Sequence, residues 1–233
     1  MNAAPIFPSD PAQAALIEQI NAALPQTQCT RCGYPDCRAY AQAIAIDAVP
    51  INRCPPGGAE GILRLAALTG QPLHALDTAC GAEGPRLMAV IDEAWCIGCT
   101  LCLEACPVDS ILGAHKRMHT VIEPLCTGCE LCVPVCPVDC IRLEPITGDR
   151  TGWSAWSSAQ ADEARDRYAR HLARNARLQH EQDARLEAKA AEKLADLPAH
   201  SQHTDPAVLD RKRAVIEAAL ARARARKATD GAV

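Results

Sequence analysis

Residues 96–107 read CIGCTLCLEACP, and residues 126–137 repeat the pattern 30 positions later as CTGCELCVPVCP. From position 96 to position 112, ten of the seventeen residues recur in the second copy. Both copies space their cysteines as Cys-x2-Cys-x2-Cys-x3-Cys and place a proline after the fourth. Self-similarity of this kind indicates a doubled supersecondary unit.

Cysteines at this spacing are typical of ligands to [4Fe-4S] clusters. Three thiolates of one copy hold one cube, and the fourth crosses to the cube of the other copy. Zinc fits poorly, because a tetrahedral zinc site uses two separated Cys-x2-Cys pairs. Gly98 and Gly128 are expected to let each loop curl around its cube. The pattern predicts two clusters, one on Cys96, Cys99, Cys102 and Cys136 and the other on Cys106, Cys126, Cys129 and Cys132.

A second group of cysteines precedes the repeat. Its members have spacings of x2, x4 and x16 and are Cys29, Cys32, Cys37 and Cys54. Four thiolates here suit one [4Fe-4S] cluster, and a four-cysteine zinc site is also compatible with a small helical unit. Cys80 and Cys140 are interpreted as non-ligands, because Cys140 aligns with Ser110 in the repeat and Cys80 stands alone in a connector.

The composition places these cysteines in a reducing environment. The chain of 233 residues fits one large domain or two small ones. All 14 cysteines lie between Cys29 and Cys140, and the chain has only seven aromatic residues, so clusters are expected to form much of the core. The first residues lack the basic, apolar and cleavage regions of a secretory signal. The longest aliphatic run, residues 87–91, is far shorter than the roughly 20 residues of a membrane span.

Periodicity predicts an α+β fold class. Helical spacing favours helices from Asp10-Pro11 to Pro25, at 38–48, 59–68 and 158–194, and from Asp205-Pro206 onward, whereas 87–92 and 119–122 are strand candidates. Each half of the repeat is expected to run strand, cysteine loop, short helix, closing strand. The predicted domains are a helical [4Fe-4S] domain at 1–84, a pseudo-twofold, ferredoxin-like 2[4Fe-4S] domain at 85–152, and a charged helical tail at 153–233.

Charge divides the chain into two parts of opposite sign. Residues 1–152 hold 9 basic and 16 acidic residues, a net charge of −7, and residues 153–233 hold 15 and 12, a net charge of +3. This balance does not indicate a basic nucleic-acid binder. The basic tail is instead expected to fold over the acidic domain or dock beside it, with an apolar stripe that includes Val208, Ile216 and Leu220.

The segment Leu16–Cys54, followed by the double cysteine motif, resembles the B subunit of the Rnf/Rsx ion-translocating electron transport complex. The resemblance covers residues 10 to about 150. It implies three [4Fe-4S] clusters and assigns Cys29, Cys32, Cys37 and Cys54 to the first. Members built into the membrane begin with a hydrophobic anchor, whereas this chain starts directly at the Fe-S domain. We therefore expect a form without the anchor, cytoplasmic or peripheral on the cytoplasmic face of the inner membrane.

Electron transfer is the function that these motifs favour. The sequence has no catalytic residues that we can assign and no phosphate-binding glycine motif, so flavin or nicotinamide is expected on a redox partner, either another Rnf/Rsx subunit or an oxidoreductase. One alternative is a stand-alone soluble ferredoxin-like carrier for a cytosolic oxidoreductase. Another is a redox-sensing regulator that acts through basic tail residues such as Arg211–Arg213, Arg226 and Lys227, although no nucleic-acid partner is expected. His115 and His119 lie between the two copies and could tune the potential of a cluster, but surface histidines are more often inert, so no role is assigned to them.

Overall fold

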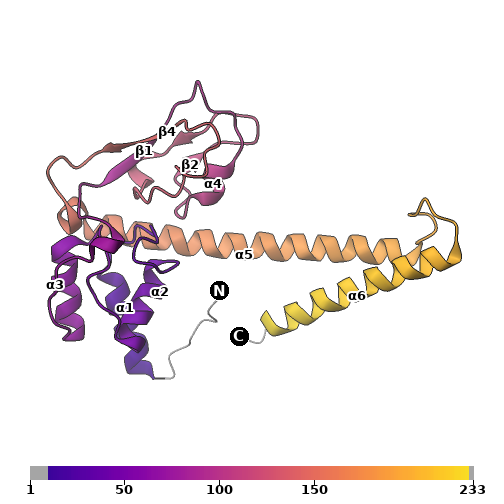
Figure 1. The fold of residues 1–233 in the computed structure, drawn as a ribbon, viewed down its shortest axis with the longest axis horizontal. Coiled ribbons are helices and arrows are strands. Elements are labelled where there is room, and N and C mark those ends of the chain that lie inside the picture. Colours follow the sequence, from indigo (N-terminus) through magenta and orange to yellow (C-terminus); the bar gives the residue numbers. More distant parts are fainter. Residues whose placement is uncertain (1–9, 231–233) are drawn as a thin grey trace. The chain divides into compact units, whose positions relative to one another are not determined.

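A computed structural model describes residues 10–230, with side chains up to residue 225 (Figure 1). The chain forms two compact units, one that ends at His171 and one that begins at Leu172. The N-terminal residues 1–9 and the side chains of Arg226 and Lys227, which entered the sequence interpretation, lie outside the described residues. Within the described part, no helix has both the length and the hydropathy that crossing a membrane requires.

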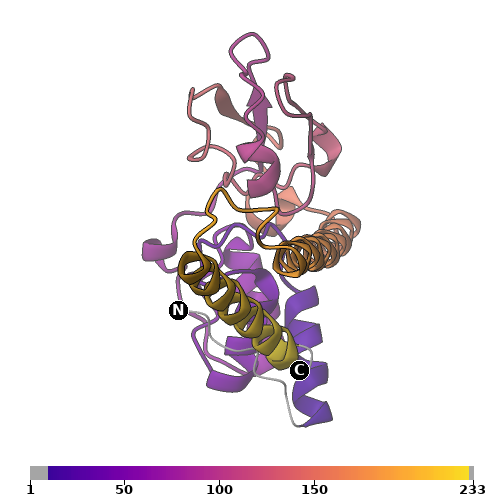
Figure 2. The same ribbon diagram turned by 90° about the vertical axis from the view of Figure 1, so that its right-hand side faces the viewer.

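The first unit begins with three helices, as the periodicity predicted: α1 (Pro11–Ala22), α2 (Cys37–Asp47) and α3 (Gly58–Thr69). Aspartates cap the first two, since Asp10 accepts a hydrogen bond from the Ala12 N–H and Asp36 accepts one from the Ala39 N–H. In both ribbon views α1 and α2 lie side by side (Figures 1 and 2). Their buried core consists of Ile17, Ile20, Leu24, Cys37, Tyr40, Ala41, Ile44, Ile51, Ile62 and Leu65.

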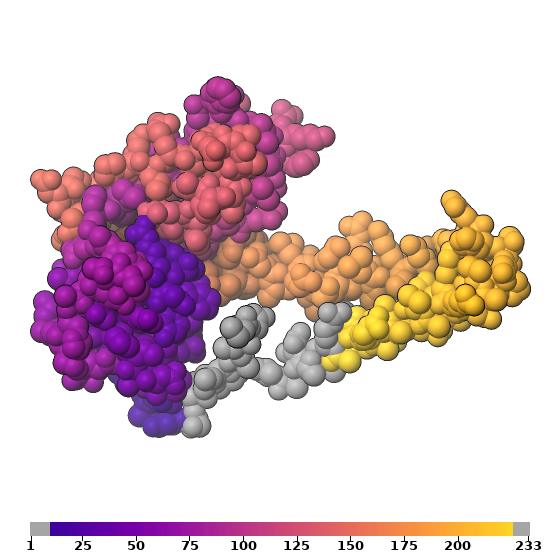
Figure 3. All heavy atoms as spheres, viewed as in Figure 1, coloured from indigo at the N-terminus to yellow at the C-terminus, as the bar shows by residue number. Residues whose placement is uncertain are grey.

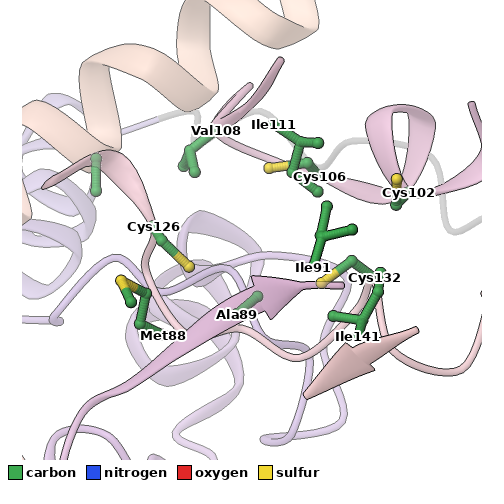
Figure 4. Packing of buried hydrophobic residues seen from close by; sticks show 11 residues of the cluster. Met88, Ala89, Ile91, Cys102, Cys106, Val108, Ile111, Cys126, Cys132 and Ile141 are labelled. Carbon is green, nitrogen blue, oxygen red and sulfur yellow. The ribbon is translucent and has the colours of Figure 1, made fainter. Parts of the chain in front are cut away.

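The doubled motif forms two small antiparallel sheets. Strand β1 (Leu87–Ile91) pairs with β4 (Ile141–Pro145), and β2 (Ile111–Leu112) pairs with β3 (Thr120–Val121). Each sheet therefore takes one strand from each half of the repeat. The intervening core combines thiols with aliphatic side chains (Figure 4). It consists of Met88, Ala89, Ile91, Cys102, Cys106, Val108, Ile111, Cys126, Cys132, Ile141 and Ala164.

One expected element is missing from the second half. The first half has the short helix α4 (Leu101–Ala105), but residues 131–135 form turns. Pro134 stands where the first copy has Glu104, and proline lacks the backbone N–H that a helix needs. Short 3-10 segments complete the unit at Thr78–Cys80, Glu123–Leu125 and Gly152–Ala155.

Two long helices follow, α5 (Ser158–Ala195) and α6 (Pro206–Asp230). The first turns of α5 belong to the first unit, where the Arg167 side chain donates hydrogen bonds to the carbonyls of Val108 and Asp109, at 2.7 and 2.9 Å. In the second unit the rest of α5 is joined to α6, and atoms of the two helices meet at the connection (Figure 3). Arg224 on α6 pairs with Glu187 on α5 at 2.7 Å.

Candidate iron-sulfur centres

The first cysteine group converges at the amino end of α2. Cys29 and Cys32 lie in the loop before the helix, and Cys37 is its first residue. Cys54 arrives from the segment before α3. The four thiols line a single hollow of about 290 Å³, a volume that includes its opening to solvent. The structure therefore brings together all four predicted residues of this group.

Buried polar side chains hold the segments that carry these cysteines. The Tyr40 side chain is 1% exposed. Its hydroxyl donates to the Pro50 carbonyl at 2.8 Å and accepts from the Arg53 N–H at 3.1 Å, just before Cys54. The amide oxygen of Gln28 accepts the Cys37 N–H at 2.9 Å. Neither positioning residue could be singled out from the sequence, because Tyr40 and Gln28 belong to no motif that would distinguish them.

The second half of the repeat builds another hollow. Its four thiols come from Cys106, Cys126, Cys129 and Cys132, and Ala89 and Val108 also line it. This hollow measures about 320 Å³, again including its opening. Cys106 comes from the first copy of the motif and the other three come from the second, which is the crossed arrangement that the spacing predicted.

The remaining four predicted ligands also influence one another. Burial and, to a smaller extent, the negative charges of Cys99, Cys96 and Cys136 together raise the pKa of Cys102 to about 11. Cys136 comes from the second copy, so this set crosses between copies as well. The Cys96 sulfur accepts the backbone N–H of His119 at 3.4 Å.

Glycines allow the two ligand loops to approach neighbouring backbone. Gly98 and Gly128 have φ values of +67° and +66°, in the left-handed region. A Cβ on Gly98 would overlap the backbone of Lys116 and Arg117, and one on Gly128 would overlap the backbone of Leu87. The loops therefore need glycine at both positions for conformation and for space. The curl of each loop around a cube stays a prediction.

Burial opposes the ionisation of several of these thiols. Burial raises the pKa of Cys129 and Cys132 to about 12, and it also raises the pKa values of Cys37 and Cys54. Buried thiols of this kind stay protonated at neutral pH unless a bound cation stabilises the thiolate. All-sulfur donor sets around a hollow match the ligand chemistry of iron-sulfur clusters. Within the described residues, no three His, Cys, Asp or Glu side chains converge on a point as one metal ion requires.

Cys80, Cys140 and His119 lie outside the predicted ligand sets. The Cys80 thiol faces the Asp77 carboxylate at 3.9 Å, and the Cys140 sulfur lies 3.5 Å from that of Cys136. His119 differs from expectation, because it is 1% exposed rather than a surface residue. Its Nδ1 lies 3.2 Å from the Cys102 sulfur. His115 is exposed, as expected.

Comparison with known proteins identifies both cysteine segments. A family model described as a 4Fe-4S dicluster domain matches residues 89–143, and one described as a putative Fe-S cluster matches residues 24–56. No solved structure matches the chain.

Curated relatives share one description, that of the B subunit of an ion-translocating oxidoreductase complex. The protein of Azoarcus sp. (strain BH72) is 59% identical over 138 residues, which are 59% of this chain and 75% of the relative. That of Alkalilimnicola ehrlichii is 54% identical over 152 residues, 64% of this chain and 81% of the relative. The cysteine motifs, the two family models and these relatives agree, and the chain belongs to the family of iron-sulfur B subunits of ion-translocating (Rnf) oxidoreductase complexes.

Proposed function

We propose that this chain relays single electrons through three [4Fe-4S] clusters. The proposed ligand sets are Cys29, Cys32, Cys37 and Cys54; Cys96, Cys99, Cys102 and Cys136; and Cys106, Cys126, Cys129 and Cys132. The observation that carries the proposal is the grouping of thiols, since two of the sets each line one hollow. When bound, such a cluster accepts and releases one electron at a time.

The first set is the one for which zinc is the serious alternative. A zinc ion draws four sulfurs to about 2.3 Å from one point. The thiols of Cys29, Cys32, Cys37 and Cys54 line one hollow. In a cube each sulfur binds a different iron, and the cube is favoured over a single ion by the family model described as a putative Fe-S cluster, which matches residues 24–56.

We further propose that residues 85–152 form a pseudo-twofold ferredoxin-like domain, between a helical cluster domain at 1–84 and a charged tail at 153–233. Support comes from the two sheets, each of which joins one strand from each half. It also comes from left-handed backbone at positions 30 apart: Gly98 and Gly128, Thr100 and Glu130, and Asp109 and Asp139.

Metal analysis tests the cluster count. The purified chain should hold about 12 iron and 12 acid-labile sulfide per molecule. Cys29→Ala should remove about a third of both, whereas the matched variants Cys80→Ala and Cys140→Ala should remove none. Eight iron and one zinc in the unaltered chain would show that the first set is a zinc site. Iron loss in Cys80→Ala would contradict the first ligand set.

The partners follow from the relatives, which are named as subunits of a complex. We propose that other subunits of such a complex exchange electrons with this chain and that a flavin or nicotinamide site lies on a partner. The alternative is a stand-alone carrier for another oxidoreductase. Anoxic lysis at native expression level separates the two, because a complex subunit should sediment with membranes until a salt wash, and a stand-alone carrier should stay in the supernatant.

The tail, residues 153–233, is proposed to strengthen partner binding. Trp153 is 3% exposed, and its indole N–H donates to the Ala23 carbonyl at 3.0 Å, so a truncation that tests the tail should keep the first unit through His171. Such a truncation should leave the iron content intact and weaken partner binding. Unchanged partner affinity would refute this role.

A further inference from the structure

His119 lies against two cysteines of one proposed ligand set. Its Nδ1 is 3.2 Å from the Cys102 sulfur, and its backbone N–H donates to the Cys96 sulfur at 3.4 Å. The ring is buried, and its Nε2 has no hydrogen-bond partner. The only hydrogen-bonding contact of this buried ring is therefore with a sulfur of the proposed ligand set, an arrangement that requires an explanation.

The repeat supplies a comparison position for this histidine. Thirty residues earlier stands Ala89, which lines the hollow of the other dicluster set. Equivalent positions of the two halves thus carry an imidazole beside one set and a methyl group beside the other. The two ligand sets therefore differ in a hydrogen-bond donor that the repeat itself does not require.

The residue paired with each of these two positions on the neighbouring strand complements it in size. In the β1–β4 sheet, small Ala89 pairs with large Leu143. Continuing the β2–β3 register by one residue places Gly113 opposite His119, and a Cβ on Gly113 would overlap the imidazole ring. Gly113 and Leu143 are also 30 residues apart. Where one sheet pairs Ala89 with Leu143, the other pairs His119 with Gly113, and the glycine leaves room for the imidazole ring. The packing of this sheet therefore accommodates the histidine.

We propose that His119 donates its Nδ1–H to the Cys102 sulfur and thereby raises the reduction potential of the cluster held by Cys96, Cys99, Cys102 and Cys136. The inference rests on the proposed ligand sets. An iron-bound thiolate has no hydrogen to donate, so the 3.2 Å contact is a hydrogen bond only if Nδ1 carries one. That tautomer leaves Nε2 as a bare acceptor.

The direction of the effect follows from charge. Reduction adds negative charge to the cluster and its sulfurs, and a hydrogen-bond donor stabilises that charge more in the reduced form. The other set has its own donor, because the Ser110 hydroxyl lies 3.2 Å from the Cys106 sulfur. The two donors act on different ligand sets, so each should shift a different one-electron step.

The test removes the donor and keeps the packing. In the double variant His119→Ala with Gly113→Leu, the pair becomes that of the other sheet. His119→Asn is the matched control, since its side-chain amide can donate from near the Nδ1 position. Ser110→Ala identifies which one-electron step belongs to the other cluster, because it removes the donor to Cys106. Potentials are read from a redox titration followed by electron paramagnetic resonance, and iron and sulfide are measured on every sample.

The double variant should lower the reduction potential of the cluster beside residue 119 by about 59 mV. For one electron this corresponds to a shift of about tenfold in the equilibrium toward the other cluster. His119→Asn should shift it less than about threefold, and Ser110→Ala should move the other step. Unchanged potentials with both clusters present, or equal shifts in His119→Asn and the double variant, would overturn the inference. If the double variant loses a cluster, His119→Leu takes its place under the same criteria. Absence of the two clusters from the unaltered chain would instead overturn the proposed function.

Discussion

The hydroxyl of Tyr40 offers the sharpest test of how the first cysteine group is held. This hydroxyl donates to the Pro50 carbonyl and accepts the Arg53 N–H, so it fixes the segment that ends at Cys54. Tyr40→Phe removes both hydrogen bonds and leaves the buried ring in place. Tyr34→Phe is the matched control, because the Tyr34 ring stacks on Tyr40 at 5.3 Å and the substitution preserves that stacking.

The magnitude follows from the two lost bonds. An unmatched buried donor or acceptor costs about 1–3 kcal/mol. Pro50 is exposed, so water can replace part of what its carbonyl loses, and we take the lower end for both bonds. The free energy of opening this segment then falls by about 2 kcal/mol, which raises the population of the open state about 30-fold.

Anoxic transfer of iron to a colourless chelator measures this opening. When reclosing is faster than chelation, the rate of iron release follows the open population. In Tyr40→Phe, about a third of the iron should leave about 30-fold faster than in the unaltered chain, and the rest should leave at the original rate. Release within twofold of the Tyr34→Phe control, or equal acceleration of all the iron, would refute the reasoning.

Two further substitutions test the packing around the sites. Leu65→Ala, at a fully buried position, should lower the free energy of unfolding by about 2–5 kcal/mol, and Leu63→Ala, at a position 54% exposed, should change it by less than about 0.5 kcal/mol; equal urea midpoints would contradict the described core. Gly128→Ala and Gly148→Ala both place alanine at positive φ, but only Gly128 faces backbone, that of Leu87. Gly128→Ala should therefore lower the iron content whereas Gly148→Ala should not, and equal iron contents would show that the close approach is unimportant.

The inferred hydrogen bonds bear on electron transfer within this chain. Two clusters in a symmetric repeat would have similar potentials and would share an electron almost equally. The contact between His119 and Cys102 favours reduction of one cluster, and the contact between Ser110 and Cys106 favours reduction of the other. Side chains outside the ligand sets, rather than the cysteines themselves, therefore set where an electron resides within the dicluster domain.

Much of this protein is encoded locally. Helix starts follow from Asp10-Pro11 and Asp36, because a cap and its helix are neighbours in sequence. The cysteine repeat predicts two crossed ligand sets, in which Cys106 and Cys136 are exchanged between the copies, because the spacing of ligands around a cube is a property of a short segment. The structure places Cys106 with Cys126, Cys129 and Cys132 around one hollow. The family, too, could be named from these motifs.

The tertiary structure decided what lies around the ligands. His119 lies in a polar stretch of sequence that is typical of an exposed loop. Only the pairing of β2 with β3, which places His119 opposite Gly113, buries it against Cys102. Trp153 likewise belongs to the first unit because it reaches Ala23, which is 130 residues away. Burial and the direction of a hydrogen bond depend on contacts between distant segments, and no local pattern records those contacts.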